Sequence, residues 1–240
     1  MLDRATISGN ALTLTGQLDR AMYTAVAKVI EMAGGKWNKK AKCHLFAQDA
    51  AETIELLLLT GEIADTKKDF GQFDTPAEIA KLAVRNACIK PGMFVLEPNA
   101  GLGNLAMAVE DVGGQTAGFE IDAQRLWKAK QRCEFAGGIK HMSFLSAKPE
   151  PVFDRVVMNP PFAGQADIAH VTHAMGFLKP DGRLVAIMSN GVEFRTNKAT
   201  VAFRALMELH GGEITRLPEG AFKESGTGVN TVMVSMDARQ

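Results

Sequence analysis

Short apolar runs with the length of buried strands follow one another along the chain from about residue 90. Between most of them lie segments with helical spacing of apolar positions, and several of these end at paired glycines. The runs predicted as strands are 93–97, 115–120, 139–145, 152–158, 183–188, 213–218 and 230–236. The segments predicted as helices are 103–113, 122–138, 167–182 and 198–212.

This alternation predicts an α/β fold, with one mostly parallel sheet and helices on both of its faces. The last two predicted strands have no helix between them. Parallel strands need a long crossover, whereas antiparallel strands do not. We therefore expect the last two strands to pair like a hairpin, with the final strand antiparallel to the others.

The first part of the chain has a different pattern, which predicts a small α+β lobe. Residues 5–16 alternate like a hairpin, 18–35 have helical spacing, 36–46 form a basic stretch that leads into a strand, and 49–62 are again helical. The connecting segment 65–73 is the predicted boundary. We expect one domain over residues 1–68, with a possible contact to nucleic acid, and a second over 69–240.

Composition restricts the setting of this fold. A formal net charge of zero means that only a local basic patch, and not the overall charge, supports a nucleic-acid partner. Widely spaced cysteines, no signal peptide and no long apolar run predict a cytoplasmic protein without a membrane span. His170 and His173 share a helix face but lack further ligands, so no metal site is expected. The sequence does not distinguish a monomer from a homodimer.

A glycine-rich loop follows the first strand of the predicted sheet. Glu97 ends the strand, Asn99 and Ala100 follow it, and Gly101 and Gly103 come just before a helix. Glycines let the backbone approach a ligand, and a helix N-terminus offers free N–H groups. At the end of the next strand stands Glu120, close to the spacing of about 20 residues at which an acid binds ribose hydroxyls. The pair of strand ends predicts a nucleoside site.

The segment 73–84 is predicted to be a helix with a capped start. Thr75 is expected as the N-cap, Pro76 at the first helical position and Glu78 as the partner in a capping box. Helix capping by itself is sufficient to explain these three residues. The alternative is that the helix start also faces an anionic group of the ligand.

The fourth strand ends abruptly in Asn159, Pro160, Pro161 and Phe162. Prolines end a strand, which is the simple interpretation of this sequence. The same residues also suit a planar amine with a delocalised lone pair. In this interpretation the Asn159 side-chain oxygen and the Pro160 carbonyl would accept from its N–H groups, and Phe162 would offer a face for stacking. Such a site acts through orientation and polar preorganisation, without a strong base.

The motifs at 73–80, 96–106, 119–122, 159–162 and 222–231 resemble, in this order, those of S-adenosylmethionine-dependent amino-methyltransferases, chiefly the N6-adenine DNA methyltransferases. The resemblance covers about residues 70–240 and implies a Rossmann-like class I fold with seven strands. It implies that Asn159–Phe162 hold the target amine. The cofactor contacts that it implies are Phe73, Thr75, Pro76, Glu97, Asn99, Ala100, Gly101, Gly103, Glu120, Ile121 and Asn159.

Two features depart from the pattern of the family. Many relatives have an Asp after the third strand, which meets the adenine of the cofactor, whereas Ser143 and Phe144 stand there in this chain. Serine accepts a hydrogen bond more weakly than a carboxylate, so weaker cofactor binding is expected. No long insertion separates the glycine loop from Asn159, and we expect no separate target-recognition domain. The N-terminal lobe resembles the leader segments of compact phage or plasmid methyltransferases.

The expected nucleic-acid contacts are basic residues and two aromatic ones. Lysines surround Trp37 in the N-terminal lobe, where they suit phosphates and Trp37 suits a base. The alternative for Trp37 is packing within its own lobe. The resemblance places Phe222 beside a flipped base, and the alternative is a core position. The full set is Lys36, Trp37, Lys39, Lys40, Lys42, Arg195, Lys198, Phe222 and Lys223.

The function predicted from these features is methyl transfer from S-adenosylmethionine to adenine N6 in duplex DNA, with the target base flipped out. Protection of mobile DNA from restriction is a plausible role. The alternatives are adenine N6 in RNA, cytosine N4 in DNA, and the amide of a protein glutamine. A rival of another class is a non-catalytic protein that binds the cofactor and DNA.

Overall fold

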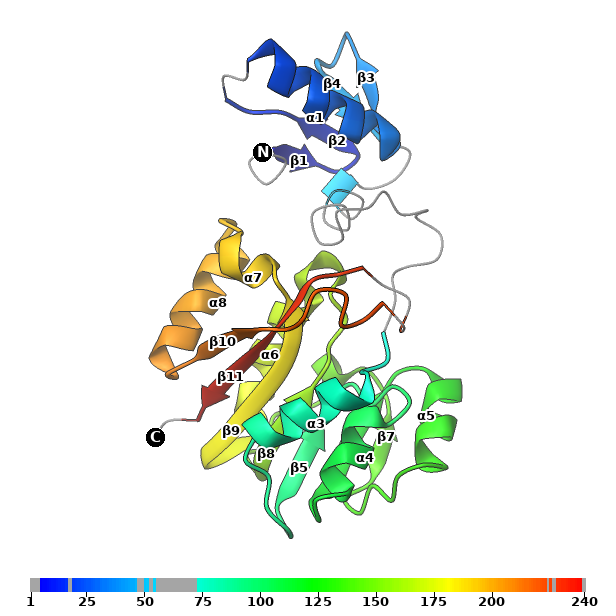
Figure 1. Cartoon of the computed structure of the whole chain (residues 1–240), viewed down its shortest axis with the longest axis vertical. Coiled ribbons are helices and arrows are strands. Elements are labelled where there is room, and N and C mark those ends of the chain that lie inside the picture. Colours follow the sequence, from blue (N-terminus) through cyan, green and yellow to red (C-terminus); the bar gives the residue numbers. More distant parts are fainter. Residues whose placement is uncertain are drawn as a thin grey trace. The chain divides into compact units, whose positions relative to one another are not determined.

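The computed structural model describes residues 5–16, 19–46, 50, 51, 54, 73–223, 225 and 228–238. The chain separates into two compact units, Met1–Gly71 and Gln72–Gln240 (Figure 1). The predicted helix at 49–62 and the predicted boundary at 65–73 lie almost wholly outside the described residues.

The N-terminal unit is a small antiparallel sheet with a helix packed against it. Its strands pair in the order β1-β2-β4-β3. Leu12, Ile30 and Phe46 form its buried core, and the side chain of Asp19 caps the helix by accepting from the N–H of Met22 at 2.8 Å. Its elements are β1 Thr6–Ser8, β2 Ala11–Thr13, α1 Arg20–Met32, β3 Lys36–Asn38 and β4 Cys43–Leu45.

The C-terminal unit contains a seven-stranded sheet with the order β10-β11-β9-β8-β5-β6-β7. All pairs among β5 to β9 are parallel, and β11 is antiparallel to both of its neighbours. This confirms the predicted mostly parallel sheet with an antiparallel last strand. The strands are β5 Phe94–Glu97, β6 Gln115–Glu120, β7 Ile139–His141, β8 Phe153–Met158, β9 Leu178–Ser189, β10 Glu213–Arg216 and β11 Thr231–Asp237.

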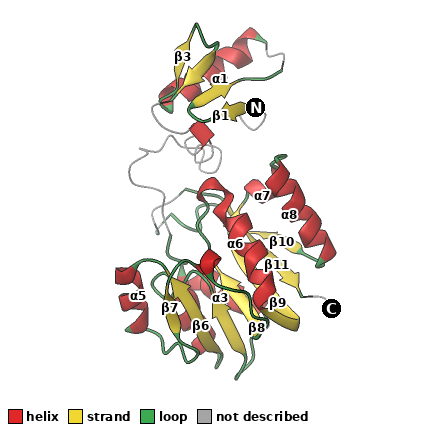
Figure 2. Cartoon of the chain, turned by 180° about the vertical axis from the view of Figure 1, so that it is seen from behind, coloured by secondary structure: helices red, strands yellow, loops and turns green. Residues whose placement is uncertain are grey.

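Helices cover both faces of this sheet. Helices α3, α4 and α5 lie on one face, and α6 and α8 on the other (Figure 1, Figure 2). On the second face the main core joins α6 and α8 to the sheet, with Phe203 and Met158 among its buried members. The helices are α3 Ala77–Asn86, α4 Asn104–Glu110, α5 Ala123–Lys130, α6 Ala166–Ala174, α7 Gly191–Phe194 and α8 Lys198–Leu209.

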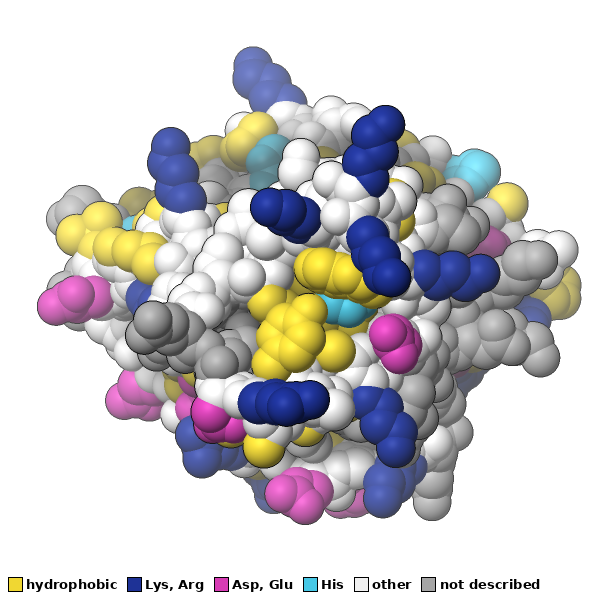
Figure 3. Space-filling model, turned by 90° about the horizontal axis from the view of Figure 1, so that it is seen from above, with side chains coloured by type: hydrophobic (Ala, Val, Ile, Leu, Met, Phe, Trp, Pro, Cys, Tyr) yellow, Lys and Arg dark blue, Asp and Glu magenta, His cyan; other side chains and the backbone are white. Residues whose placement is uncertain are grey.

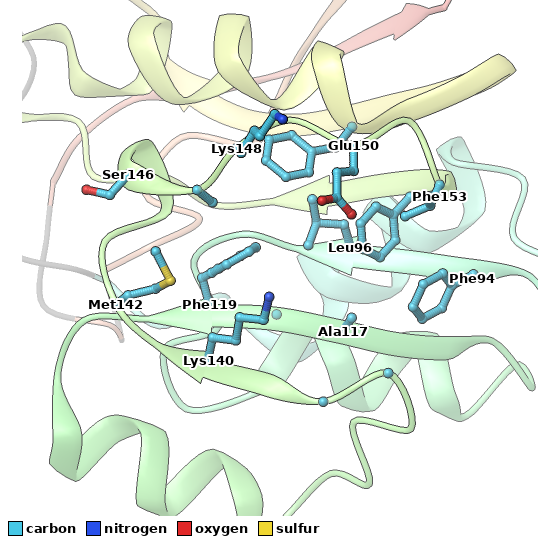
Figure 4. A pocket seen from close by; sticks show the side chains of 16 residues that line it. Phe94, Leu96, Ala117, Phe119, Lys140, Met142, Ser146, Lys148, Glu150 and Phe153 are labelled. Carbon is cyan, nitrogen blue, oxygen red and sulfur yellow. The ribbon is translucent and has the colours of Figure 1, made fainter.

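The connection from β7 to β8, residues 142–152, is described throughout and contains only the 3₁₀ turn Phe144–Ser146. The strand predicted over 139–145 is therefore too long. The strand ends early because Phe144 turns inward and packs against the rings of Phe119 and Phe177. Between this connection and the sheet lies a pocket of about 370 Å³ with aromatic walls (Figure 4). None of the predicted site residues lines it.

Candidate functional site

The glycine loop joins β5 to α4 at the carboxyl edge of the parallel strands. Gly101 and Gly103 have φ values of 56° and 82°, a left-handed conformation that glycine adopts without strain. The N–H of Gly101 donates to Glu120 Oε2 at 2.7 Å. The other oxygen of Glu120 accepts from the N–H of Asp122 at 2.8 Å. Because β5 and β6 are parallel neighbours, their ends bring the predicted loop and the predicted acid together.

Glu97 lies under this loop and is fully buried. Its Oε2 accepts from the N–H of Ala106 in α4 at 2.9 Å. Desolvation raises the pKa of Glu97 well above its ordinary value, and the nearby carboxylates of Glu120 and Glu110 raise it further. Burial thus disfavours the charged form of Glu97 relative to an exposed carboxyl group.

Asn159 lies at the end of β8, on the same edge of the sheet. Its Nδ2 donates to the carbonyl oxygen of Phe73 at 2.8 Å and to Oγ1 of Thr75 at 3.1 Å. A backbone carbonyl only accepts, so the bond to Phe73 fixes which end of the amide is the NH₂. The side-chain oxygen, Oδ1, is buried and has no hydrogen-bond partner among the described residues. Buried acceptors are usually paired, which makes this atom the chemical anomaly of the site.

The predicted capping role of Thr75 is wrong. Helix α3 begins at Ala77, Pro76 is its N-cap, and no side chain caps it. The backbone of Pro76 is extended, with a ψ of 146°, so the helix starts one residue later than predicted. Glu78 makes no capping box and pairs instead with Lys81 at 2.9 Å. Thr75 is buried, and its hydroxyl and carbonyl orient the side chains of Asn159 and Asn104 respectively.

Aromatic rings form one wall beside Asn159. The rings of Phe73 and Phe162 have centroids 6.5 Å apart and an interplanar angle of 27°. Phe162 is 5% exposed, so most of its surface already packs within the unit. Phe73 and Asn159 also line one pocket together with Glu97, Asn99, Ala100 and Gly101. The structure therefore brings the predicted cofactor loop and the predicted amine site to one place.

Three other predicted cofactor contacts lie near the ends of β6 and β7. Ile121 directly follows Glu120 and is 59% exposed, so its side chain is open to a ligand. Ser143 is partly buried. Phe144 is a correction, because it is 2% exposed and its ring belongs to an aromatic cluster with Phe119, His173 and Phe177. Its surface is used by the core.

Two residues near the site were not recognised as part of it from the sequence. Nδ1 of His170 lies 3.1 Å from the side-chain nitrogen of Asn99, and burial, followed by the charge of His173, lowers the pKa of His170 to about 4. Asp167 accepts from the N–H groups of Ile168 and Ser189, which joins the start of α6 to the end of β9. Desolvation raises its pKa to about 6. Their signal in the sequence is weak, because both stand in an ordinary helical pattern.

The predicted nucleic-acid contacts divide into exposed and buried residues. All the lysines are exposed, and Trp37 is 43% exposed with its ring 5.0 Å from that of the buried His44. Figure 3 shows Lys and Arg side chains around a central group of hydrophobic and histidine atoms. Arg195 and Phe222 are corrections. They are 5% and 0% exposed, so their side chains pack inside the C-terminal unit and present no surface to nucleic acid.

Within the described part of the chain, no group of three or more His, Cys, Asp or Glu side chains is placed to hold a metal ion. The same residues include no helix that is long and apolar enough to cross a membrane.

Known proteins resemble this chain over most of its length. The family described as "Methyltransferase small domain" matches residues 82–210. A type I restriction enzyme StySPI methylase subunit from Salmonella potsdam is 25% identical, over 73% of this chain and 42% of its own. A type I restriction-modification methyltransferase subunit from Streptococcus thermophilus has a TM-score of 0.62 at 22% identity, over 77% of this chain and 48% of its own.

A modification subunit of a putative type I restriction enzyme from Vibrio vulnificus YJ016 superposes with a TM-score of 0.60 at 18% identity. The superposition covers 48% of that subunit and 78% of this chain. The two structures establish the likeness in fold. The chain spans less than half the length of each of these three proteins.

Proposed function

We propose, from the premise that this chain belongs to the methyltransferase small domain family, that it methylates N6 of adenine in DNA. The observation that carries the proposal is the oxygen of Asn159, a buried acceptor with no partner among the described residues. It lies beside a glycine loop at the carboxyl edge of the sheet, where open α/β sheets bind their ligands. An exocyclic amine supplies the N–H donors that this oxygen lacks.

S-adenosylmethionine is the methyl donor of this family, and its sulfonium group makes the methyl carbon electrophilic. The residues at this edge fit such a cofactor. The positive φ values of Gly101 and Gly103 let the loop turn tightly at this edge, and Glu120 is assigned to the ribose hydroxyls. Exposed Ile121 offers an apolar surface to its adenine, and Ser143 stands close by as a hydrogen-bonding group. The segment Phe73–Pro76 bounds its methionine end.

The amine half of the site works through two acceptors. Asn159 Oδ1 and the carbonyl oxygen of Pro160 accept from the two N–H groups of the amine, which directs the nitrogen lone pair toward the methyl group. The fixed φ of the prolines holds that carbonyl in place. The nitrogen loses a proton to water after transfer, so no strong base is required. Preorganised acceptors of this kind supply catalysis through orientation and electrostatics.

DNA is the substrate class that the named relatives favour. The curated relative is a methylase subunit of a restriction enzyme, a class of protein that acts with DNA. Adenine is favoured by the sequence Asn159–Phe162, which resembles that of N6-adenine methyltransferases. We infer that the protein acts in restriction-modification or in protecting DNA from restriction.

The N-terminal lobe is the part that we assign to DNA contact. Its exposed lysines at 36, 39, 40 and 42 lie around exposed Trp37, a combination that suits phosphates and a stacked base. Lys198 and Lys223 are exposed on the C-terminal unit and are assigned the same role. Replacing Lys39, Lys40 and Lys42 by Glu should weaken DNA binding and flatten its dependence on salt. Unchanged affinity and slope would remove the lobe from this role.

The experiment that tests the proposed substrate is methyl transfer from tritiated S-adenosylmethionine to four acceptors in parallel. These are duplex DNA, single-stranded DNA, RNA and a protein mixture. We expect label in duplex DNA above the other three. Label chiefly in RNA or protein would contradict the proposal, and no label in any acceptor alongside normal cofactor binding would favour a non-catalytic binder.

A further inference from the structure

An ion pair spans the cofactor side of the site. Arg125, in the first turn of α5, donates from Nη2 to Asp74 Oδ1 at 2.5 Å. Asp74 lies between Phe73 and Thr75, the two residues that hold the amide of Asn159. The side chains of Arg125 and Asp74 are 22% and 34% exposed, so solvent reaches both. Partly exposed pairs contribute little to stability, about 0–1 kcal/mol, which is a weak structural reason for the pair.

The pair lies directly over the glycine loop. A Cβ atom placed on Gly101 would stand 2.8 Å from Arg125 Nη2 and 3.7 Å from Asp74 Oδ1. Both side chains line the same pocket as Glu97, Asn99 and Asn159. A ligand bound above the loop therefore meets this ion pair.

Arg125 is the one cation among the described residues that line the pocket. Of the two acids there, Asp74 is paired with Arg125, and burial raises the pKa of the other, Glu97. The Nε of Arg125 is buried and has no hydrogen-bond partner within the described part of the chain. A guanidinium can bind a carboxylate through two parallel N–H groups. Arg125 has donors left for an anionic group even while Nη2 remains on Asp74.

We propose that Arg125 and Asp74 recognise the amino-acid end of the cofactor, with Arg125 pairing with its carboxylate and Asp74 with its ammonium group. This inference rests on the cofactor of the proposed function and does not depend on the methyl acceptor. In the free protein the two side chains satisfy each other. On binding, the charges of the cofactor's zwitterion replace or extend that pairing, so neither charge is left unpaired.

The test compares two ligands by calorimetry. S-adenosylhomocysteine carries the amino-acid end, and 5′-methylthioadenosine lacks it. Arg125→Gln should weaken binding of S-adenosylhomocysteine by roughly 10- to 100-fold, the range for a lost hydrogen bond to a charged group. Binding of 5′-methylthioadenosine should stay within about 2-fold. Asp74→Asn should act in the same direction with a smaller loss. Lys128→Gln, which removes an exposed charge from the same helix, is the matched control and should change neither affinity.

An equal loss of affinity for both ligands in Arg125→Gln would show a merely structural role and overturn the inference. A second variant, Arg125→Asp with Asp74→Arg, restores an ion pair in reversed order. We expect it to recover thermal stability but not affinity for S-adenosylhomocysteine, because its charges oppose those of the zwitterion. Recovered affinity would contradict the inference. A different outcome separates the two proposals. If the variants change ligand affinity as expected but the wild-type protein transfers no methyl group to DNA, the proposed substrate is contradicted and the role of Arg125 and Asp74 is retained.

Discussion

The two halves of the site treat their buried polar atoms differently. In the cofactor half, both oxygens of Glu120 accept backbone N–H groups, and Glu97 accepts from Ala106. In the amine half, the NH₂ of Asn159 is used twice while its oxygen has no partner among the described residues. An unpaired buried acceptor costs about 1–3 kcal/mol of stability. The comparison teaches that these two carboxylates are paired within the protein, whereas the oxygen of Asn159 is left for the donor that we propose.

Asn159→Ala gives the largest expected effect, because it removes the unpaired acceptor and leaves the cofactor half intact. We expect the rate of methyl transfer to fall by roughly 10²- to 10³-fold, the range for removing one preorganised polar group. Affinity for S-adenosylhomocysteine should change little. Single-turnover kinetics and calorimetry measure the two quantities.

Asn86→Ala is a matched control for this variant, since Asn86 lies at the end of α3 and its side chain donates to the carbonyl of Leu82 in the same helix. It should leave both quantities unchanged. Equal transfer rates in Asn159→Ala and the wild-type protein would end the assignment of Asn159 as the amine acceptor.

The next largest expected effect concerns Asp167 and is a change in the free energy of unfolding with pH. Burial raises its pKa from 3.8 to about 6, so the folded protein binds more protons than the unfolded chain between these values. Stability should therefore fall as pH rises through this window, by about 3 kcal/mol at about 1.4 kcal/mol per pKa unit. Asp167→Asn cannot titrate. Its free energy of unfolding in urea should rise relative to wild type between pH 4 and pH 6.

A difference between the two proteins that stays constant across this pH range would show that Asp167 does not titrate as described. The comparison isolates Asp167 because Glu97, whose pKa is also raised, is present in both proteins.

Glu120→Gln tests the cofactor half of the site, where Glu120 is assigned to the ribose. The carboxylate bonds to two backbone N–H groups, and its negative charge is lost in the variant. We expect affinity for S-adenosylhomocysteine to fall by about 10-fold or more, as for other hydrogen bonds to charged groups. Glu78→Gln, on the exposed face of α3, is the control and should bind normally. Unchanged affinity in Glu120→Gln would refute the assignment to the ribose.

Thr75→Val has the smallest expected effect. It removes one of two acceptors from the NH₂ of Asn159 and leaves the carbonyl of Phe73. The transfer rate should fall by about 5-fold, for a net hydrogen bond of about 1 kcal/mol. Thr75→Ser keeps the hydroxyl and should retain the wild-type rate. Equal losses in the two variants would show that packing, and not the hydrogen bond, explains the effect.

The strand ends were predictable from the sequence because parallel strands share one carboxyl edge. Glu97, Glu120 and Asn159 were expected to meet there, and the structure brings them to one edge of the sheet. The antiparallel last strand followed from the absence of a helix before it. These features depend on the order of elements, which local periodicity reveals.

Contacts between distant residues were not predictable in the same way. The partner of Thr75 is 84 residues away, and that of Arg125 is 51 residues away. A local capping rule therefore gave the wrong role to Thr75, and no local pattern singles out Arg125. The burial of Arg195 and Phe222 depends likewise on the packing of the whole unit.

The central claim is that the site holds an exocyclic amine of adenine. Mass spectrometry of nucleosides from duplex DNA, methylated by the wild-type protein and by Asn159→Ala, tests it most directly. We predict N6-methyldeoxyadenosine with the wild-type protein and none above background with the variant. N4-methyldeoxycytidine or C5-methyldeoxycytidine as the product, or the same yield of N6-methyldeoxyadenosine from both proteins, would contradict the claim.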